Sequence, residues 1–222
     1  MVSKHLKKEK TNTVLNLHRM ETCYLCGSID DLTRDHIPPK NLFPSPKPSN
    51  LITVWCCRKC NERYSLIDES FRIFTSSVIN RSKTGESVWN KKVMQSSFVR
   101  SPKLKSATIK SLVPIEEEIN GIKVKATGIT YPIKKTKSFL VRLTKGFTRH
   151  FNPEIDLAGA KFKVYHITPN QQIVDMLHQK FFYVEKGDGV FRMWRMFVKD
   201  NVPESVWVYV FYDGLMFMIK VN

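Results

Sequence analysis

Two pairs of cysteines in the N-terminal half have the spacing of a metal site. Within each pair two residues separate the sulfurs, and 30 residues separate Cys23 and Cys26 from Cys57 and Cys60. Four thiolates can complete the tetrahedral coordination of one Zn²⁺ and leave no position open for a substrate. The sequence therefore predicts a structural zinc. The alternative is a set of buried or redox-active cysteines, and Cys56 stands outside both pairs.

A zinc ion would explain how the segment between the cysteine pairs keeps a defined shape. This segment contains five prolines: Pro38, Pro39, Pro44, Pro46 and Pro48. Such a density of proline excludes long helices and central strands. Because the side chains here can form only a small core, the metal would supply the missing free energy of folding.

Polar residues with catalytic potential lie between the cysteine pairs and directly after them. Asp35 and His36 are adjacent, Asn50 follows, and Asn61 comes directly after the last cysteine. An imidazole can take a proton from an attacking water, and carboxylate or amide oxygens suit a hard divalent cation. Each residue alone is better explained as a turn or capping residue. Their joint arrangement between zinc ligands favours a catalytic site.

In this order the residues resemble the HNH endonucleases, whose ββα-metal motif packs a β-hairpin against a helix. The resemblance covers about residues 22–75 and is nearest to the four-cysteine zinc subtype, as in phage endonuclease VII. It implies that His36 is the general base, that Asp35 and Asn61 hold a catalytic Mg²⁺ or Mn²⁺, and that Asn50 ties down the hairpin loop. Many members carry a His where this chain has Asn61.

The resemblance also implies phosphodiester hydrolysis, with DNA as a more natural substrate than RNA. Phage defence, restriction, a toxin and junction resolution are all compatible biological roles. Many HNH enzymes cut both strands as dimers, so a homodimer is one expected form. A zinc-ribbon module that binds nucleic acid without cutting it is the rival function, but it would not need Asp35, His36 and Asn61 together.

The charge of the whole chain is consistent with nucleic acid as the partner. Lys and Arg number 36 against 20 Asp and Glu, a formal net charge of +16, and both halves of the chain are basic. No stretch approaches the roughly 18 apolar residues of a membrane helix. The lysine-rich start has no apolar signal core, so we expect no membrane partner and a cytoplasmic location.

We expect an α+β fold in three parts. These are a basic N-terminal arm over residues 1–21, a zinc-stapled ββα-metal domain over 22–100, and a basic α+β domain with an antiparallel sheet over 101–222. Apolar residues three and four apart predict an amphipathic helix from near Asn61, with Asp68 on its solvated face in preference to a supporting position beside the metal site. The helical region is expected to end near Gly85, and Ser101 to Lys103 have the composition of a linker.

Short alternating runs in the second half predict strands over residues 122–126, 162–167, 190–198 and 206–221. The last run contains a hairpin signal at residues 212–215. Helices are predicted over 138–150 and 169–180, the second with Thr168 as its N-cap. Aromatic residues alternate with basic ones in these strands, and we expect them to form sheet core in preference to base-stacking surfaces.

Overall fold

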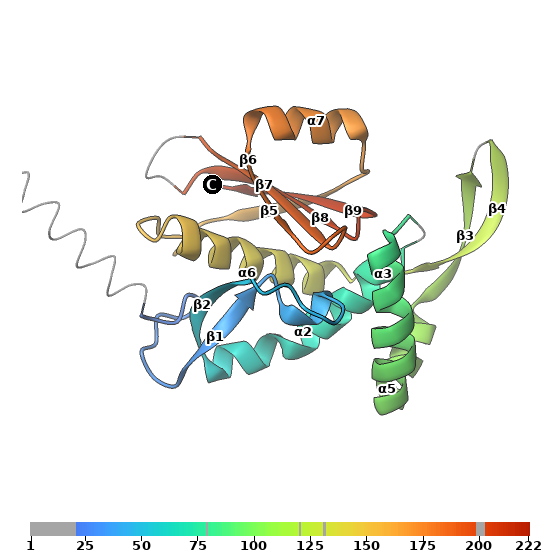
Figure 1. Cartoon of the computed structure of the whole chain (residues 1–222), viewed down its shortest axis with the longest axis horizontal. Helices are drawn as coiled ribbons and strands as arrows, with labels where there is room; N and C mark the ends of the chain where they lie inside the picture. Colours follow the sequence, from blue (N-terminus) through green and yellow to red (C-terminus); the bar gives the residue numbers. More distant parts are fainter. Residues whose placement is uncertain (1–20, 79, 120, 131, 199–202) are drawn as a thin grey trace, which may run out of the picture.

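The computed structural model describes residues 21–222 except 79, 120, 131 and 199–202 (Figure 1). The predicted N-terminal arm therefore lies outside the described residues, apart from Glu21. The described chain mixes helices with antiparallel sheets, which confirms the predicted structural class at this level. In the same residues, no helix is long and apolar enough to cross a lipid bilayer.

A β-hairpin and a long helix follow the first cysteine pair. They are β1 (Leu32–Ile37), the single 3₁₀ turn η1 (Lys40–Leu42), β2 (Ile52–Cys57) and α2 (Arg58–Ser76). Strands β1 and β2 are antiparallel, with Arg34 opposite Trp55 and His36 opposite Thr53. Helix α2 begins three residues before the predicted start, because Cys57 occupies its N-cap position and Cys60 lies in its first turn.

Four short helical segments then lead away from α2. They are α3 (Lys83–Ser87), η2 (Val88–Ser97), which is wound as a π-helix, α4 (Phe98–Arg100) and α5 (Pro102–Lys110). The prediction that the helical region ends at Gly85 was wrong, since Gly85 is buried inside α3. The predicted linker at Ser101 is instead a helix start: its hydroxyl accepts the Leu104 N–H at 3.3 Å, and Pro102 takes the first helical position.

Gly85 allows α3 to pack directly against the buried ring of Tyr212. A Cβ at Gly85 would lie 2.7 Å from the Tyr212 Cβ, and Tyr212 is anchored by its hydroxyl, which donates to the Leu42 carbonyl at 2.6 Å. Gly85→Ala is therefore expected to destabilise the protein, because overpacking costs about 1–3 kcal/mol and exceeds the ~1 kcal/mol gained in helix propensity. Urea unfolding would measure this, with the exposed Glu86→Ala as control; equal midpoints for both variants would contradict the close packing.

The second half contains a separate hairpin, a long helix and a five-stranded sheet. The elements are β3 (Leu112–Ile119), β4 (Ile122–Ile129), α6 (Ile133–Phe151), β5 (Phe162–Ile167), α7 (Gln171–Lys180), β6 (Phe182–Lys186), β7 (Phe191–Phe197), β8 (Ser205–Phe211) and β9 (Leu215–Val221). The sheet has the order β5-β9-β8-β7-β6 with every pair antiparallel.

The predicted strands and helices of this half are confirmed, although β4 and α6 are longer than predicted and β7 and α7 are shorter. Strands β3 and β6 were not predicted. The hairpin turn is confirmed by Tyr212 and Asp213, whose φ angles are 50° and 57°. The predicted cap of α7 was wrong: Asn170 is the N-cap, and its side chain accepts the Gln172 N–H at 2.8 Å. An Asn two residues further along provides the same hydrogen bond that Thr168 was expected to make.

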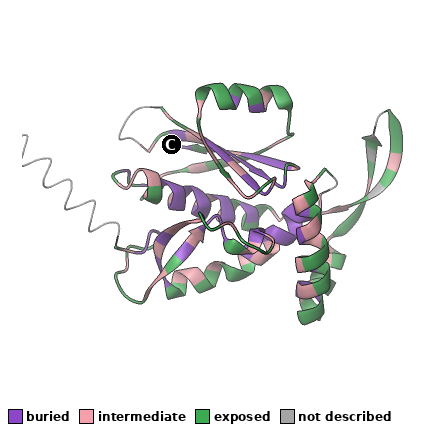
Figure 2. Ribbon diagram, viewed as in Figure 1, coloured by how far each residue is buried: buried purple, intermediate pink, exposed green. Residues whose placement is uncertain are grey.

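Helix α6 lies between the five-stranded sheet on one side and the β1–β2–α2 unit on the other, while α7 covers the opposite face of the sheet (Figure 1). The buried residues of α6 are distributed along most of the helix (Figure 2). The Phe71 ring of α2 stacks on the Phe139 ring of α6 with centroids 3.8 Å apart. Gly146 brings α6 close to β1, because a Cβ there would lie 2.7 Å from Ile37 Cδ1.

Residues from both predicted domains share one hydrophobic core. The cluster around α6 includes Ile37 and Phe71 from before residue 100 together with Phe139, Phe147 and Phe217 from after it. A division at residue 100 stays a prediction, and in the structure α6 is the element that joins its two sides.

Candidate functional site

The four paired cysteines come together in one cluster. The sulfurs of Cys23, Cys26, Cys57 and Cys60 all lie within 4.8 Å of one another, and those of Cys26 and Cys57 are 3.7 Å apart. Tetrahedral zinc with Zn–S bonds of about 2.3 Å requires sulfurs roughly 3.8 Å apart. The cluster is therefore close enough to bind one zinc ion, as the spacing of the cysteines predicted.

Local backbone geometry positions these sulfurs. The Cys23 N–H donates to the Ser28 carbonyl and the Gly27 N–H to the Cys23 carbonyl, both at 2.8 Å, and Gly27 has a φ of 78°. This tight turn presents the first pair. The second pair begins α2, where Cys57 is the N-cap residue and Cys60 lies in the first turn.

The fifth cysteine is a neighbour of the cluster. Cys56 is buried, and its sulfur lies 3.9 Å from that of Cys23. The hydrogen bond between these two side chains lowers the pKa of Cys23 to about 3, so Cys23 is the sulfur best prepared to be a thiolate. Cys56 thus contacts the cluster through Cys23 but is not one of the four clustered cysteines.

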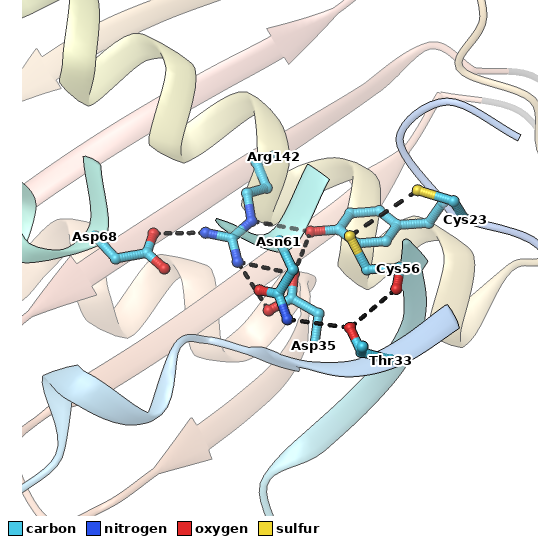
Figure 3. A network of polar contacts seen from close by, with 8 residues as sticks. Cys23, Thr33, Asp35, Cys56, Asn61, Asp68 and Arg142 are labelled. Atoms are coloured by element: carbon cyan, nitrogen blue, oxygen red, sulfur yellow. Dashed lines mark hydrogen bonds and ion pairs between the residues drawn. The ribbon is translucent and has the colours of Figure 1, made fainter. Parts of the chain in front are cut away.

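Asp35 is buried on the side of the hairpin that faces α2 and α6. Both of its carboxylate oxygens accept from Nη2 of Arg142 at 2.8 Å, and Oδ2 also accepts the Tyr24 hydroxyl at 2.8 Å (Figure 3). Tyr24 belongs to the turn that carries the first cysteine pair, and Arg142 belongs to α6. The carboxylate therefore links the cysteine cluster to α6.

Arg142 has a partner for every guanidinium nitrogen. Besides Asp35, Nη1 donates to Oδ1 of Asp68 at 2.5 Å and Nε donates to the Tyr24 hydroxyl at 3.1 Å. The group also lies over the Tyr64 ring, with its central carbon 4.8 Å from the centroid, and its side chain is only 2% exposed. A buried cation with this many partners is fully compensated.

Asp68 was expected on a solvated helix face, and that prediction was wrong. It is buried because α6 covers this side of α2, and it faces Arg142. Desolvation raises the pKa of Asp68 to about 6, although Arg142 acts in the opposite direction. Burial opposes the charge of Arg142, but Tyr24, Asp68 and Asp35 outweigh it and raise the pKa of Arg142 above its ordinary value. The guanidinium therefore stays charged.

Asn61 lies on the same side of the hairpin as Asp35. Its Nδ2 donates to the Thr33 hydroxyl at 3.2 Å, and that hydroxyl donates to the Cys56 carbonyl at 3.0 Å (Figure 3). Thr33 and Asp35 are two residues apart on β1 and so point to the same face. The structure thus brings the two predicted ligands of the divalent ion to one side of the hairpin.

A divalent cation does not fit at Asp35 in this arrangement. Both oxygens that would bind Mg²⁺ or Mn²⁺ accept hydrogen bonds from Arg142. The positive charge of this guanidinium would also repel a metal ion placed beside the carboxylate. Arg142 pairs with the carboxylate that the resemblance assigns to the cation, and no pattern in the sequence indicated this arginine.

His36 and Asn50 lie away from this buried network. His36 is half-buried, and alternation along β1 points it to the opposite face from Asp35. Burial, with the positive charges of Lys40 and Lys47, lowers the pKa of His36 against a smaller opposing effect of Asp35, so its imidazole is neutral near pH 7. Asn50 is exposed two residues before β2, and its role in holding the hairpin loop stays a prediction.

Comparison of the chain with protein-family models, curated proteins and solved structures finds no match. Its function is therefore inferred from three features of the molecule. These are the four-cysteine cluster, the buried Arg142 network, and the hairpin face that carries His36.

Proposed function

We propose that the chain is an HNH-type endonuclease that hydrolyses phosphodiester bonds in DNA, with His36 as the general base. The observation that carries the proposal is the β1–β2–α2 unit itself. A hairpin with His36 near the end of its first strand precedes a helix that begins at a four-cysteine cluster. Asn61, in the first turn of that helix, points toward the Asp35 side of the hairpin.

The chemistry of His36 supports this role. A neutral, half-exposed imidazole can accept a proton from water as the water attacks phosphorus. Lys40 and Lys47 act electrostatically on the same ring, so the surroundings attract the phosphate group of a substrate. Asp35 and Asn61 would be the residues to hold Mg²⁺ or Mn²⁺, and this would require the Arg142 guanidinium to leave the Asp35 carboxylate.

A non-catalytic zinc-ribbon module that binds nucleic acid is the second candidate. The observation that favours it is the contact of Arg142 Nη2 with both Asp35 oxygens, because a carboxylate that already has a buried cation needs no metal. The net charge of +16 serves binding under either function. Only cleavage separates the two.

Cleavage of supercoiled plasmid in Mg²⁺, Mn²⁺ or EDTA tests the nuclease. We expect nicking with either metal, none in EDTA, and a loss of about 100-fold or more in His36→Ala, because general-base catalysis contributes roughly 10²- to 10⁴-fold. The exposed His166→Ala is the matched control, and every protein is checked for equal zinc content. DNA binding without cutting under all conditions would contradict the nuclease and favour the binding module.

A further inference from the structure

A cavity of about 250 Å³ opens between the outer face of the hairpin and the last turn of α6. Arg34, Trp55, Arg149 and His150 line it, together with one acidic residue, Glu21. The guanidinium carbon of the exposed Arg34 lies 3.7 Å from the centre of the Trp55 ring. Stacking fixes the orientation of this cation and leaves its hydrogen-bond donors available to a ligand.

This cavity is next to the proposed general base. Thr53, which also lines it, is directly opposite His36 across the two strands. Residues opposite each other in an antiparallel pair have Cβ atoms about 4.5–5.5 Å apart. Arg34 precedes His36 by two positions and so shares its face of β1. A phosphate bound in the cavity would therefore lie next to the phosphate that a water activated by His36 attacks.

Positive charge continues from the cavity along the edge of the five-stranded sheet. The centroids of the His150 and Phe151 rings are 4.7 Å apart, and the guanidinium carbon of Arg195 lies 4.9 Å from the centroid of the same Phe151 ring. The guanidinium carbon of Arg195 is 4.5 Å from the centroid of the Phe182 ring. Phe182 is 47% exposed on the edge strand β6. By contrast, Trp194, Trp207 and Phe217 are buried in the core of the sheet, as expected for its aromatic residues.

We propose that these residues bind one strand of nucleic acid, with a backbone phosphate in the cavity and an unpaired base on Phe182. We call this surface the basic strip and define it as Arg34, Trp55, Arg149, His150, Arg195 and Phe182. Guanidinium groups bind phosphate through two parallel hydrogen bonds, and aromatic rings stack on bases of any sequence. The strip rests on the proposed function only for its position beside His36, since a binding module would use it equally.

Anisotropy of a labelled single-stranded DNA and of its duplex, measured in EDTA, tests the strip without cleavage. The variant Arg34→Gln with Arg149→Gln is expected to reduce the salt dependence of single-strand binding, lowering the slope of log K against log salt by about 0.7 for the one phosphate in the cavity. The control Lys103→Gln with Lys105→Gln removes the same charge from exposed positions of α5. Equal effects of the two double variants would overturn the phosphate site.

Phe182→Ala tests whether an unpaired base stacks on the Phe182 ring. It is expected to weaken single-strand binding about 5- to 150-fold, as the loss of one stacked base does, and to weaken duplex binding less. Phe182→Trp should restore binding. An unchanged single-strand affinity, or equal losses on both DNAs, would overturn the stacking. Failure of the nuclease would appear as bound but uncut DNA, whereas failure of the strip would appear as unchanged binding by all variants.

Discussion

Arg142→Met is expected to destabilise the protein by about 3–5 kcal/mol, because it leaves the carboxylates of Asp35 and Asp68 buried without their cation. Both acids now accept short hydrogen bonds from this one guanidinium, at 2.8 Å and 2.5 Å. Urea unfolding with zinc present would measure the change in the free energy of unfolding. Lys137→Met, at an exposed position of the same helix, is the control and should change it by less than about 0.5 kcal/mol.

Two further measurements on this variant locate the cause. Adding Asp35→Asn and Asp68→Asn should recover much of the lost stability, since no buried charge is then left unpaired. A triple variant as unstable as Arg142→Met would show that packing, and not charge, causes the loss. If Asp35 is a metal ligand, Arg142→Met should also bind Mn²⁺ at least about tenfold more tightly than the wild type; equal weak binding would favour the non-catalytic module.

Loss of zinc is expected to have the second large effect. Apparent binding free energies of structural zinc are about 10–16 kcal/mol, which is as large as the whole stability of a typical domain. Cys57→Ser should therefore reduce bound zinc below one ion per chain and unfold the β1–β2–α2 unit. Atomic absorption and urea unfolding would record the two changes.

The adjacent Cys56→Ser is a matched control for this experiment. Cys56 is as deeply placed as its neighbour but lies outside the cluster of four sulfurs. It is expected to retain one zinc per chain, with only the pKa of Cys23 changed by loss of the thiol contact. Loss of zinc in Cys56→Ser and its retention in Cys57→Ser would reverse the assignment of ligands.

The features predicted correctly from the sequence are those with local causes. The four-cysteine cluster depends on one tight turn and on the start of α2, and the strands of the second half depend on alternation within each run. Asn61 and Asp35 reach one side of the hairpin because a strand and the following helix connect them within a short stretch of chain. These features depend on the spacing of residues that are near one another in the chain, and a single sequence is enough to show that spacing.

The features that the sequence did not reveal depend on contacts between distant segments. Arg142 is 107 positions from Asp35, and nothing in the sequence around it distinguishes it from other basic residues of a basic chain. Asp68 was placed on a solvated face because α2 was expected to bury one side only, but α6 covers a second side. The helix start at Ser101 did have a local signal, since Ser followed by Pro is typical of an N-cap and first position.

The position of α6 between two layers also determines which fragments of this protein can keep their structure. A fragment ending at residue 100 would keep every zinc ligand but would uncover Phe71 and Ile37, which now pack against α6. It would also leave Asp35 and Asp68 without the guanidinium between them. A zinc unit transferred to another protein would therefore need α6, or a redesigned apolar and neutral surface in its place.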